Sequence, residues 1–348
     1  MSADGGRSGH PVTAAVIGCG EVSSVHFDAL VANPDICVVA VCDADPIRLG
    51  LAAQRLSCPG YADYLRMLEA ERPDVVHICT PHHLHADMAI ACLERGVKLL
   101  LEKPLASTIA DAQRVIEAAD RSAAQLGVCF QNRYNPTSLA LREVLDEQRF
   151  GAVGGARASV TWSRDESYLL AGPWRGRWVT AGGGVLINQA IHTLDLLQWF
   201  LGDVADVRGT ASTLLLGSAI EVEDTASMAL THQCGRRSLF YATNCHVENS
   251  PVTIEILTES ARLVSDTDLV ARHPDGRREL LAEQPVVAGE KAYWGASHAL
   301  LIDDFYRQVG AGRPFWIDAR EAAKSLNILT AVYDQSQLSG REQLAHSR

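Results

Sequence analysis

The chain has 348 residues, of which 47% are hydrophobic and 21% charged, and its formal net charge at pH 7 is −11. This length suits two globular domains, and no apolar run reaches the roughly 20 residues that cross a bilayer. Because nucleic-acid surfaces need clustered Lys and Arg, we expect neither a nucleic-acid partner nor a membrane partner.

The first third of the chain alternates short apolar runs with helical stretches. We predict strands at residues 12–18, 37–43, 74–81, 98–104 and 126–132, and helices at residues 23–33, 46–56, 85–96 and 108–124. Strands that are apolar on both faces and alternate with helices are typical of a parallel sheet covered on both sides. The pattern therefore predicts a doubly wound α/β domain over residues 1–125.

Beyond residue 150 the pattern changes to strands with little helix between them. We predict strands at residues 156–162, 207–216, 225–232, 237–247, 252–259 and 261–266, and helices at residues 185–201, 296–310 and 319–337. This order favours an α+β domain over residues 126–348, built on a large, mostly antiparallel open sheet. We expect the C-terminal helices, within residues 296–340, to pack near the domain junction.

Nine cysteines are scattered along the chain without a CxxC pair. Several of them stand in or beside apolar runs, as Cys42, Cys79 and Cys129 do. This distribution is typical of buried thiols in a reducing compartment, and the N-terminus lacks the apolar core of a signal peptide. We therefore expect a cytoplasmic protein.

The first predicted strand ends in a glycine-rich turn that leads directly into a helix. Gly18, Gly20 and Ser23 follow the GxGxxG pattern with Ser in the last place, and Glu21 and Val22 lie between them. The first Gly permits the tight turn, the second lets a pyrophosphate approach the backbone, and the helix N-terminus faces that anion. With a strand before it and a helix after it, the motif predicts a Rossmann site for a dinucleotide.

Asp43 stands at the end of the second predicted strand. A carboxylate there accepts hydrogen bonds from the adenosine ribose hydroxyls and repels a 2′-phosphate, so it favours NAD over NADP. Two alternatives stay open. Asp43 could instead cap the next helix, a role that Asp45 could also fill, and Arg48 could hold a 2′-phosphate.

Lys103 ends a predicted buried strand, in the sequence Glu102-Lys103-Pro104. Ligands bind at the carboxyl edge of such a sheet, and a lysine desolvated there has a lowered pKa and can act as acid or base. The alternative is a surface lysine paired with Glu102.

The predicted helix at residues 185–201 carries an unusual polar stripe. At helical spacing, one face holds Asn188, His192, Asp195 and Trp199. A solvated face normally carries Lys and Glu, so this one is better suited to line a polar cleft, with His192 as a functional residue. A hydrogen-bonded core histidine is the alternative.

Together these motifs resemble the Gfo/Idh/MocA family, the relatives of glucose–fructose oxidoreductase and inositol 2-dehydrogenase. The resemblance covers nearly the whole chain, through VIGCGEVSSVHFDAL, TPHHLH, EKP, GGGVLINQAIHTLD and SHALLIDDF. It implies an N-terminal Rossmann domain that carries NAD(P), and a C-terminal open sheet that builds the substrate pocket. It also implies a homo-oligomer, a homodimer or homotetramer.

By this resemblance, Lys103 and His192 are the catalytic residues. The family frequently has Asp four residues before the histidine, whereas this chain has Asn188, and a neutral amide cannot take up a proton. Asn188 and Asp195 are therefore expected to bind substrate hydroxyls, although Asp195 could instead orient His192. Which of Lys103 and His192 is the base stays open.

Further site residues are expected around these. Beyond the glycine turn and Asp43, the expected cofactor contacts are Thr80, Pro81, His82, His85, Glu102, Lys103 and Gln131. Aromatic rings with Arg are the usual surface for a sugar ring, so the further expected substrate contacts are Arg133, Arg164, Tyr168 and Trp174, and loop packing is the alternative. Candidates to close the pocket are Tyr293 and Trp294.

A metal site is not expected. His82, His83 and His85 are close in sequence, but they share no face with the carboxylate or cysteine partners that a zinc site needs.

The sequence therefore predicts an NAD-dependent oxidoreductase that moves a hydride to or from a ring hydroxyl of a sugar, glycoside or cyclitol. One alternative is a relative that oxidises the ring transiently to cleave or eliminate a substituent and recycles its NAD. Another is a catalytically idle NAD-binding regulator, which the replacement of Asp by Asn188 would suit.

Overall fold

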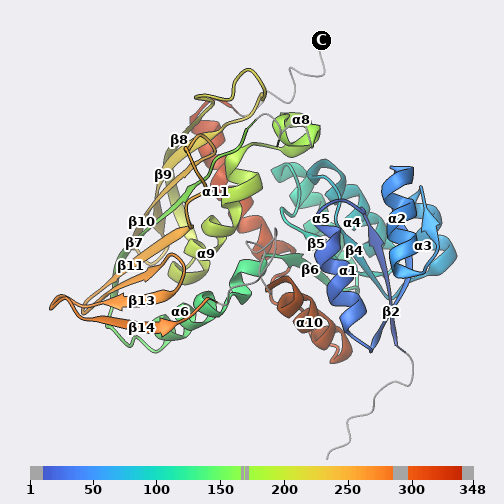
Figure 1. Ribbon diagram of the computed structural model, residues 1–348, viewed down its shortest axis with the longest axis horizontal. Helices are drawn as coiled ribbons and strands as arrows, with labels where there is room; N and C mark the ends of the chain where they lie inside the picture. The colour runs from blue at the N-terminus through green and yellow to red at the C-terminus, as the bar shows by residue number, and fades with distance from the viewer. Residues whose placement is uncertain (1–10, 166–167, 169–171, 285–296, 339–348) are drawn as a thin grey trace, which may run out of the picture.

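The protein is described by a computed structural model, which covers residues 11–165, 168, 172–284 and 297–338. Two sheets organise the fold, one of six strands and one of eight. Figure 1 shows the larger sheet along one side of the molecule and the smaller one at the other side, with helices between them. The predicted combination of a doubly wound α/β part and an α+β part with a large, mostly antiparallel sheet is confirmed.

The six-stranded sheet is parallel throughout. Its order is β3-β2-β1-β4-β5-β6, with bounds β1 (Val12–Ile17), β2 (Ile36–Cys42), β3 (Gly60–Tyr61), β4 (Val75–Ile78), β5 (Lys98–Glu102) and β6 (Leu126–Cys129). Strands β2 and β3 are added on one side of β1, and strands β4 to β6 on the other side. The order of addition thus reverses between β1 and β4, and the carboxyl ends of these two strands are the expected place for a ligand. The sheet includes β6, which starts just after the domain boundary predicted at residue 125.

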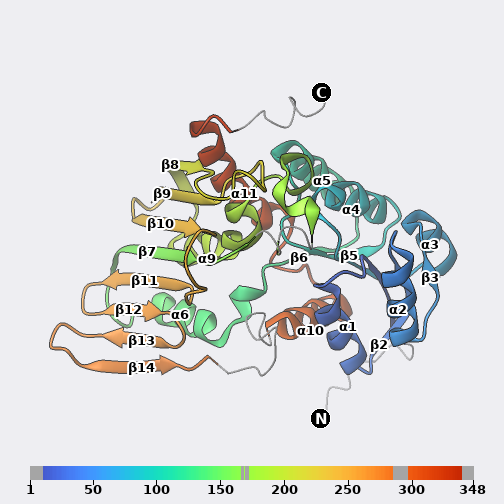
Figure 2. The same ribbon diagram turned by 45° about the horizontal axis from the view of Figure 1, so that its top comes forward.

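Helices cover both faces of this sheet, as Figure 2 shows. They are α1 (Ser23–Ala32), α2 (Pro46–Leu56), α3 (Tyr64–Glu71), α4 (His85–Glu94) and α5 (Ile109–Arg121). The sequence analysis missed β3, which has two residues, and α3, which begins after the N-cap Asp63. Within the described ranges, the search for a helix long and apolar enough to cross a membrane found none.

The eight-stranded sheet is mixed, with β7 at its centre. Its order is β14-β13-β12-β11-β7-β10-β9-β8, with bounds β7 (Val153–Thr161), β8 (Val204–Ser212), β9 (Thr225–His232), β10 (Arg237–Thr243), β11 (Thr253–Thr258), β12 (Arg262–Ser265), β13 (Leu269–Arg272) and β14 (Arg278–Ala282). β7 and β10 run parallel and the other neighbours antiparallel. The strands β13 and β14 and the helix α6 (Pro136–Asp146) were not predicted.

Helices α9 (Ile191–Leu201) and α11 (Ala319–Gln335) lie between the large sheet and the first domain (Figure 1). α10 (Ser297–Gly310) packs on α1, and α11 packs on α5. The segment between α10 and α11 also joins the first sheet, because Val128 N donates to Ile317 O at 2.9 Å. A Cβ on Gly127 would lie 2.7 Å from the ring of Phe315, so that ring packs directly against β6.

A buried ion-pair network connects the turn that follows β6 to helices α9 and α11. Arg133, on the 3-10 turn Gln131–Tyr134, donates from Nε and Nη2 to Asp195 at 2.7 and 2.6 Å, and from Nη2 to Glu321 at 2.8 Å. Arg133 is fully buried and Asp195 is 1% exposed. The rings of Trp199 and Trp316 flank the guanidinium at 5.6 and 5.2 Å.

We expect Arg133→Met to lower the free energy of unfolding by about 3 kcal/mol, because it leaves Asp195 charged and unpaired in the interior. The control is Arg307→Met, which breaks an exposed ion pair with Asp303 and should change the free energy by less than about 1 kcal/mol. Urea unfolding measures both, and equal effects would contradict a structural role for the buried pair.

Candidate active site

The glycine turn has the geometry that a bound pyrophosphate needs. Gly18 has φ +91°, and a Cβ on it would lie 2.6 Å from Cys79 O, so only glycine fits. If Gly20 carried a Cβ, the nearest atom to it would be Arg48 Nη1, 3.8 Å away. There is therefore room for a ligand next to Gly20. Ser23 Oγ donates to Gly20 O at 2.7 Å, which shows how a small Ser replaces the third glycine.

The start of α1 is also suited to an anion. Within the described chain, no side chain caps its N-terminus and no acidic residue stands in its first turn. The backbone N–H groups at the start of a helix carry partial positive charge, which favours a phosphate over the turn. The turn and helix therefore fit a dinucleotide.

Asp43 is part of this cofactor edge. Its carboxylate accepts from Cys19 N at 2.7 Å and from Asp45 N at 2.8 Å. Asp45 is the cap of α2, since it accepts from Ile47 N and Arg48 N. The alternative role of Asp43 as that cap is therefore wrong, and its half-buried carboxylate stands beside the glycine turn, where a ribose would bind.

Lys103 lies at the end of β5, where it meets the second domain. Its Nζ donates to Asn188 O at 2.8 Å. Burial, together with the positive charge of Arg175, lowers the pKa of Lys103 to about 8, although Glu102 acts in the opposite direction. The predicted lowered pKa is confirmed, and the alternative of a solvent-exposed pair with Glu102 is wrong.

Glu102 points into the core of the first domain rather than toward the cofactor edge. It is 5% exposed and lies 3.0 Å from His26 Nε2 and 3.3 Å from His298 Nε2. Burial would raise its pKa, but the hydrogen bonds of these two histidines hold the pKa well below its usual range. The expected direct contact of Glu102 with the cofactor is therefore replaced by a buried charge behind Lys103.

A chain of buried rings continues from Glu102. His26 Nδ1 lies 2.7 Å from His77 Nδ1, and His77 Nε2 lies 3.0 Å from the hydroxyl of Tyr306. Burial lowers the pKa of both histidines, so both are neutral. One arrangement satisfies every contact: Tyr306 donates to His77, His77 to His26, and His26 to Glu102.

The helix predicted at residues 185–201 has two parts. It begins with a π-helical turn (Leu186–Ala190) and continues as α9, and such turns are frequent at functional sites. The turn carries Asn188, whose carbonyl oxygen accepts from Lys103 and whose amide faces Gly183 O and Gly184 O at 3.4 and 3.3 Å.

His192 follows this turn, partly exposed and near Lys103. Burial, with the Lys103 charge, holds the pKa of His192 well below its usual range, so the ring is neutral. Its Nδ1 is buried and has no hydrogen-bond partner among the described residues. The Oε1 atom of Gln131 is also buried and also has no hydrogen-bond partner among the described residues. Both atoms are able to form a hydrogen bond with a ligand, as are other unpaired buried atoms of the described residues, such as Asn244 Oδ1.

Asp195 and Arg133 do not take the places expected for them. Both were expected to bind substrate, but each is paired with the other in the interior and is at most 1% exposed. Trp199 packs on Arg133 as well. The polar stripe therefore divides: Asn188 and His192 are half-buried near Lys103, whereas Asp195 lies in the core, where it pairs with Arg133.

A loop before this helix gathers the expected aromatic and basic residues. Arg164 and Arg175 lie on the ring of Tyr168, at 5.0 and 4.5 Å from its centroid, and Gln189 Nε2 donates to the Tyr168 hydroxyl at 3.1 Å. Arg175 also lies over Trp174 at 5.7 Å. This cluster joins the glycine turn through Arg175 Nη2 and Glu21 Oε2, which are 3.5 Å apart.

The histidines after β4 connect loops. His82 Nδ1 lies 2.8 Å from Ala181 O, and its ring meets the edge of Trp174 at 4.7 Å. The two nitrogens of His85 lie 2.7 Å from Pro104 O and 2.8 Å from Thr80 O. Thr80 and Pro81 follow β4 and are partly exposed. His85 connects Thr80 to Pro104, the residue after Lys103.

Other placements complete the comparison with the sequence. Val22 is the residue before α1. Tyr293 and Trp294 lie outside the described residues. One group of possible metal ligands occurs in the described ranges, His26, Glu102 and Cys129 within 4.8 Å, but His26 and Glu102 already bond to each other.

Glu223 and Tyr333 were not predicted as site residues. Glu223 binds Gly184 N and Leu186 N at the start of the π-turn, and Tyr333 donates to Glu223 and lies against Gly183. Only the run of three glycines at residues 182–184 pointed to a close neighbour there.

Comparison with known proteins agrees with this geometry. Residues 12–130 match the family model "Oxidoreductase family, NAD-binding Rossmann fold", and residues 138–264 match "GFO/IDH/MocA C-terminal domain". D-apiose dehydrogenase of Paraburkholderia graminis is 31% identical over 94% of this chain and 87% of its own. Myo-inositol 2-dehydrogenase of Thermotoga maritima is 25% identical over 72% of this chain and 74% of its own.

Among solved structures, the WlbA dehydrogenase of Bordetella pertussis, in complex with NADH and UDP-GlcNAcA, has a TM-score of 0.85 at 27% identity. The match covers 95% of this chain and 97% of that one. With both domain models matched in order, the chain belongs to the Gfo/Idh/MocA family of oxidoreductases, with an NAD-binding Rossmann domain at its N-terminus.

Proposed function

We propose that this chain is an NAD-dependent dehydrogenase that interconverts a ring hydroxyl and a ketone on a sugar, glycoside or cyclitol. The main support for this proposal is Lys103, which lies at the carboxyl edge of the first sheet. Burial lowers the pKa of this lysine to about 8. Such a group can release and take up a proton near neutral pH, and it stands beside the neutral His192.

The proposed mechanism divides the work among these residues. NAD, when bound, accepts or supplies the hydride. In the oxidative direction the neutral amine of Lys103 accepts the hydroxyl proton, while His192 hydrogen-bonds the same oxygen. Asn188 accepts a hydrogen bond from a neighbouring hydroxyl at its amide oxygen, because its amide nitrogen donates to Gly183 O and Gly184 O. Tyr168 and Trp174 pack against the ring. Orienting the substrate in this way is the largest contribution the fold can make to such a reaction.

The similar proteins support the substrate class. One relative is named for apiose and another for myo-inositol, and the WlbA structure contains a nucleotide sugar. These molecules share a polyhydroxylated ring. The proposal includes no nucleic-acid or membrane partner, and it places the protein in the cytoplasm, since all nine cysteines are free thiols.

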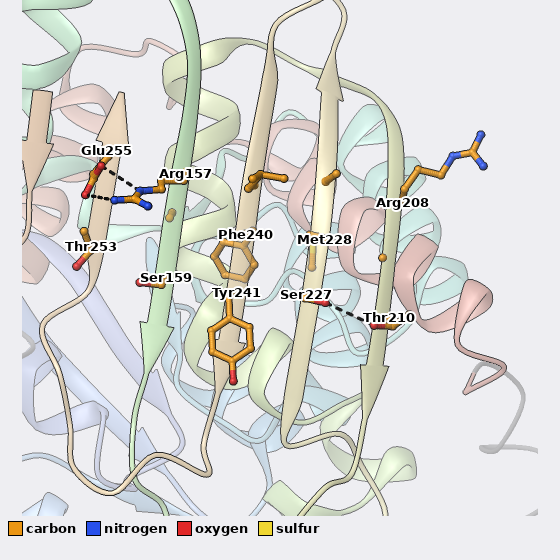
Figure 3. A pocket seen from close by; sticks show the side chains of 14 residues that line it. Arg157, Ser159, Arg208, Thr210, Ser227, Met228, Phe240, Tyr241, Thr253 and Glu255 are labelled. Atoms are coloured by element: carbon orange, nitrogen blue, oxygen red, sulfur yellow. Dashed lines mark hydrogen bonds and ion pairs between the residues drawn. The ribbon is translucent and has the colours of Figure 1, made fainter. Parts of the chain in front are cut away.

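We further propose a homo-oligomer that pairs through the open face of the eight-stranded sheet. Along β10, buried residues alternate with exposed ones, and the exposed Leu239 and Tyr241 are 62% and 42% accessible. Figure 3 shows Tyr241, Arg157 and Thr210 on the strands that line a hollow of about 790 Å³. These exposed apolar side chains stand among polar ones on the same face, such as Arg157, Thr210 and Glu255, and we infer that this mixed open face is the association site.

We expect purified protein to reduce NAD with at least one member of a panel of aldoses, inositols, glycosides and sugar nucleotides. In the oxidative direction the rate should rise with pH and level off above about 8, because the neutral amine of Lys103 is the base. Lys103→Ala and His192→Ala should each lower kcat about a hundredfold or more, while NADH binding, followed by fluorescence, persists.

Other results would point elsewhere. Substrate consumption without NADH accumulation indicates the recycling alternative, and NAD binding without turnover of any panel member indicates the regulator. Full turnover by both alanine variants would rule out the assigned roles.

We expect Lys103→Met to inactivate the protein and to raise its thermal midpoint at pH 7. Because burial lowers the pKa of Lys103 from 10.5 to about 8, the folded protein holds its proton less tightly than the unfolded chain. The resulting loss of stability is fully present below pH 8 and disappears as the pH rises to 10.5. The gain from Lys103→Met should therefore shrink at pH 10.

Lys324→Met is the matched control, because hydrogen bonds with Asp203 and Glu321 overcome burial and raise the pKa of Lys324. This variant should lower the midpoint or leave it unchanged. A thermal midpoint of Lys103→Met below that of the wild type would contradict the conclusion that burial of the charged Lys103 lowers the stability.

We expect Leu239→Glu to shift the oligomer toward monomers in sedimentation velocity, because a charge on the open sheet face opposes apolar pairing. Leu51→Glu is the control, since Leu51 on α2 has nearly the same exposure, 64%. Identical sedimentation of the two variants would contradict pairing through the sheet.

A further inference from the structure

Three consecutive glycines precede the π-turn, and the proposed chemistry alone does not require them. Gly182 and Gly183 have φ +76° and +150°. A Cβ on Gly183 would overlap the hydroxyl of Tyr333, and a Cβ on Gly184 would overlap the backbone carbonyl oxygen of Glu223. The glycines therefore let Glu223 and Tyr333 approach the backbone directly.

Glu223 uses this access to bind the start of the turn. Its carboxylate accepts from Gly184 N at 2.7 Å, from Leu186 N at 3.0 Å and from the Tyr333 hydroxyl at 2.8 Å. Its carbonyl oxygen accepts from Val185 N at 3.0 Å. Glu223 is fully buried, and burial raises the pKa of its carboxyl group to about 7, although the hydrogen bonds from Leu186 N, the Tyr333 hydroxyl and Gly184 N act in the opposite direction.

The turn held in this way leads to Lys103. Asn188 N donates to Gly184 O at 3.0 Å, and Asn188 O accepts from Lys103 Nζ at 2.8 Å. A continuous path of hydrogen bonds thus runs from the Glu223 carboxylate, through the backbone of the turn, to the ammonium group. His192 follows on the same helix.

We propose that Glu223 is a positioning residue of the active site: by binding the N–H groups of Gly184 and Leu186, it holds Asn188 O against Lys103 Nζ. Its effect on catalysis rests on the proposed function, whereas its effect on Lys103 does not. A carbonyl acceptor favours the charged form of a lysine, so Glu223 sustains the pKa of Lys103 from a distance.

The neighbouring Asp224 provides a matched control. It is also fully buried, and its carboxylate accepts from Leu214 N, Leu215 N and Leu216 N at 2.9 Å each. That segment carries no candidate site residue. Glu223→Gln and Asp224→Asn therefore make the same isosteric change, since each places an amide NH₂ against a backbone N–H.

The first measurement is the pKa of Lys103 in the protein without substrate, by competitive labelling with acetic anhydride across pH and mass spectrometry. Glu223→Gln should lower this pKa by about half a unit, and Asp224→Asn should leave it unchanged. The other groups that interact electrostatically with Lys103 are intact in both variants, namely Glu102, Arg175, His82, His85 and His192.

The second measurement is turnover. Glu223→Gln should lower kcat about tenfold with the NADH dissociation constant unchanged within about twofold, since it displaces Lys103 rather than the cofactor turn. Asp224→Asn should keep the wild-type kcat, although both variants lower the thermal midpoint.

The proposal is overturned if the two variants give the same Lys103 pKa and the same kcat, because Glu223 would then be structural only. Should Glu223→Gln fail to fold, Tyr333→Phe removes one hydrogen bond of the carboxylate and should shift the Lys103 pKa in the same direction by a smaller amount. No shift there also overturns it. If the wild type shows no turnover but Glu223→Gln still lowers the pKa of Lys103, the positioning role is supported and the proposed function is rejected.

Discussion

The hydrogen bond between Lys103 Nζ and Asn188 O is the contact on which the site depends. It joins Lys103, which directly follows β5, to Asn188 in the π-turn of the second domain. Burial, together with the positive charge of Arg175, lowers the pKa of Lys103 to about 8, whereas the carbonyl acceptor itself favours the charged ammonium group. Burial also leaves the His192 ring neutral. The position of Lys103 therefore depends on contact between the two domains.

A network of buried polar side chains begins at Glu102, the residue before Lys103. Glu102 keeps its charge there because His26 and His298 lie against it, and the chain through His77 to Tyr306 fixes the orientation of His26. A buried network of this kind holds its members in one arrangement only when every donor meets an acceptor. Its role is to place a fixed negative charge behind a lysine that changes its own charge.

The cofactor edge could be predicted from sequence, whereas the deeper part of the site could not. Gly18, Gly20, Asp43 and Lys103 occupy strand ends, and strand ends follow from local apolar runs. The role of Asp195 depends on Arg133, 62 residues away, and nothing local in the sequence reveals that pairing. Helical spacing likewise gave no sign of the π-turn, whose neighbour Glu223 lies 39 residues from Gly184. β3 has only two residues, which are too few for a periodic pattern.

The way the chain end returns to the first sheet has a consequence for biosynthesis. Val128 bonds to Ile317, Gly127 packs against Phe315, and α10 lies on α1. The Rossmann strands leave the ribosome before residues 297–317, so the β6 edge of their sheet stays uncovered until those residues have been translated as well. Domains generally fold in order of synthesis, but here the Rossmann domain is completed only after most of the second domain has been made. A fragment that stops at residue 130 would therefore be an unfinished core rather than a portable nucleotide-binding module.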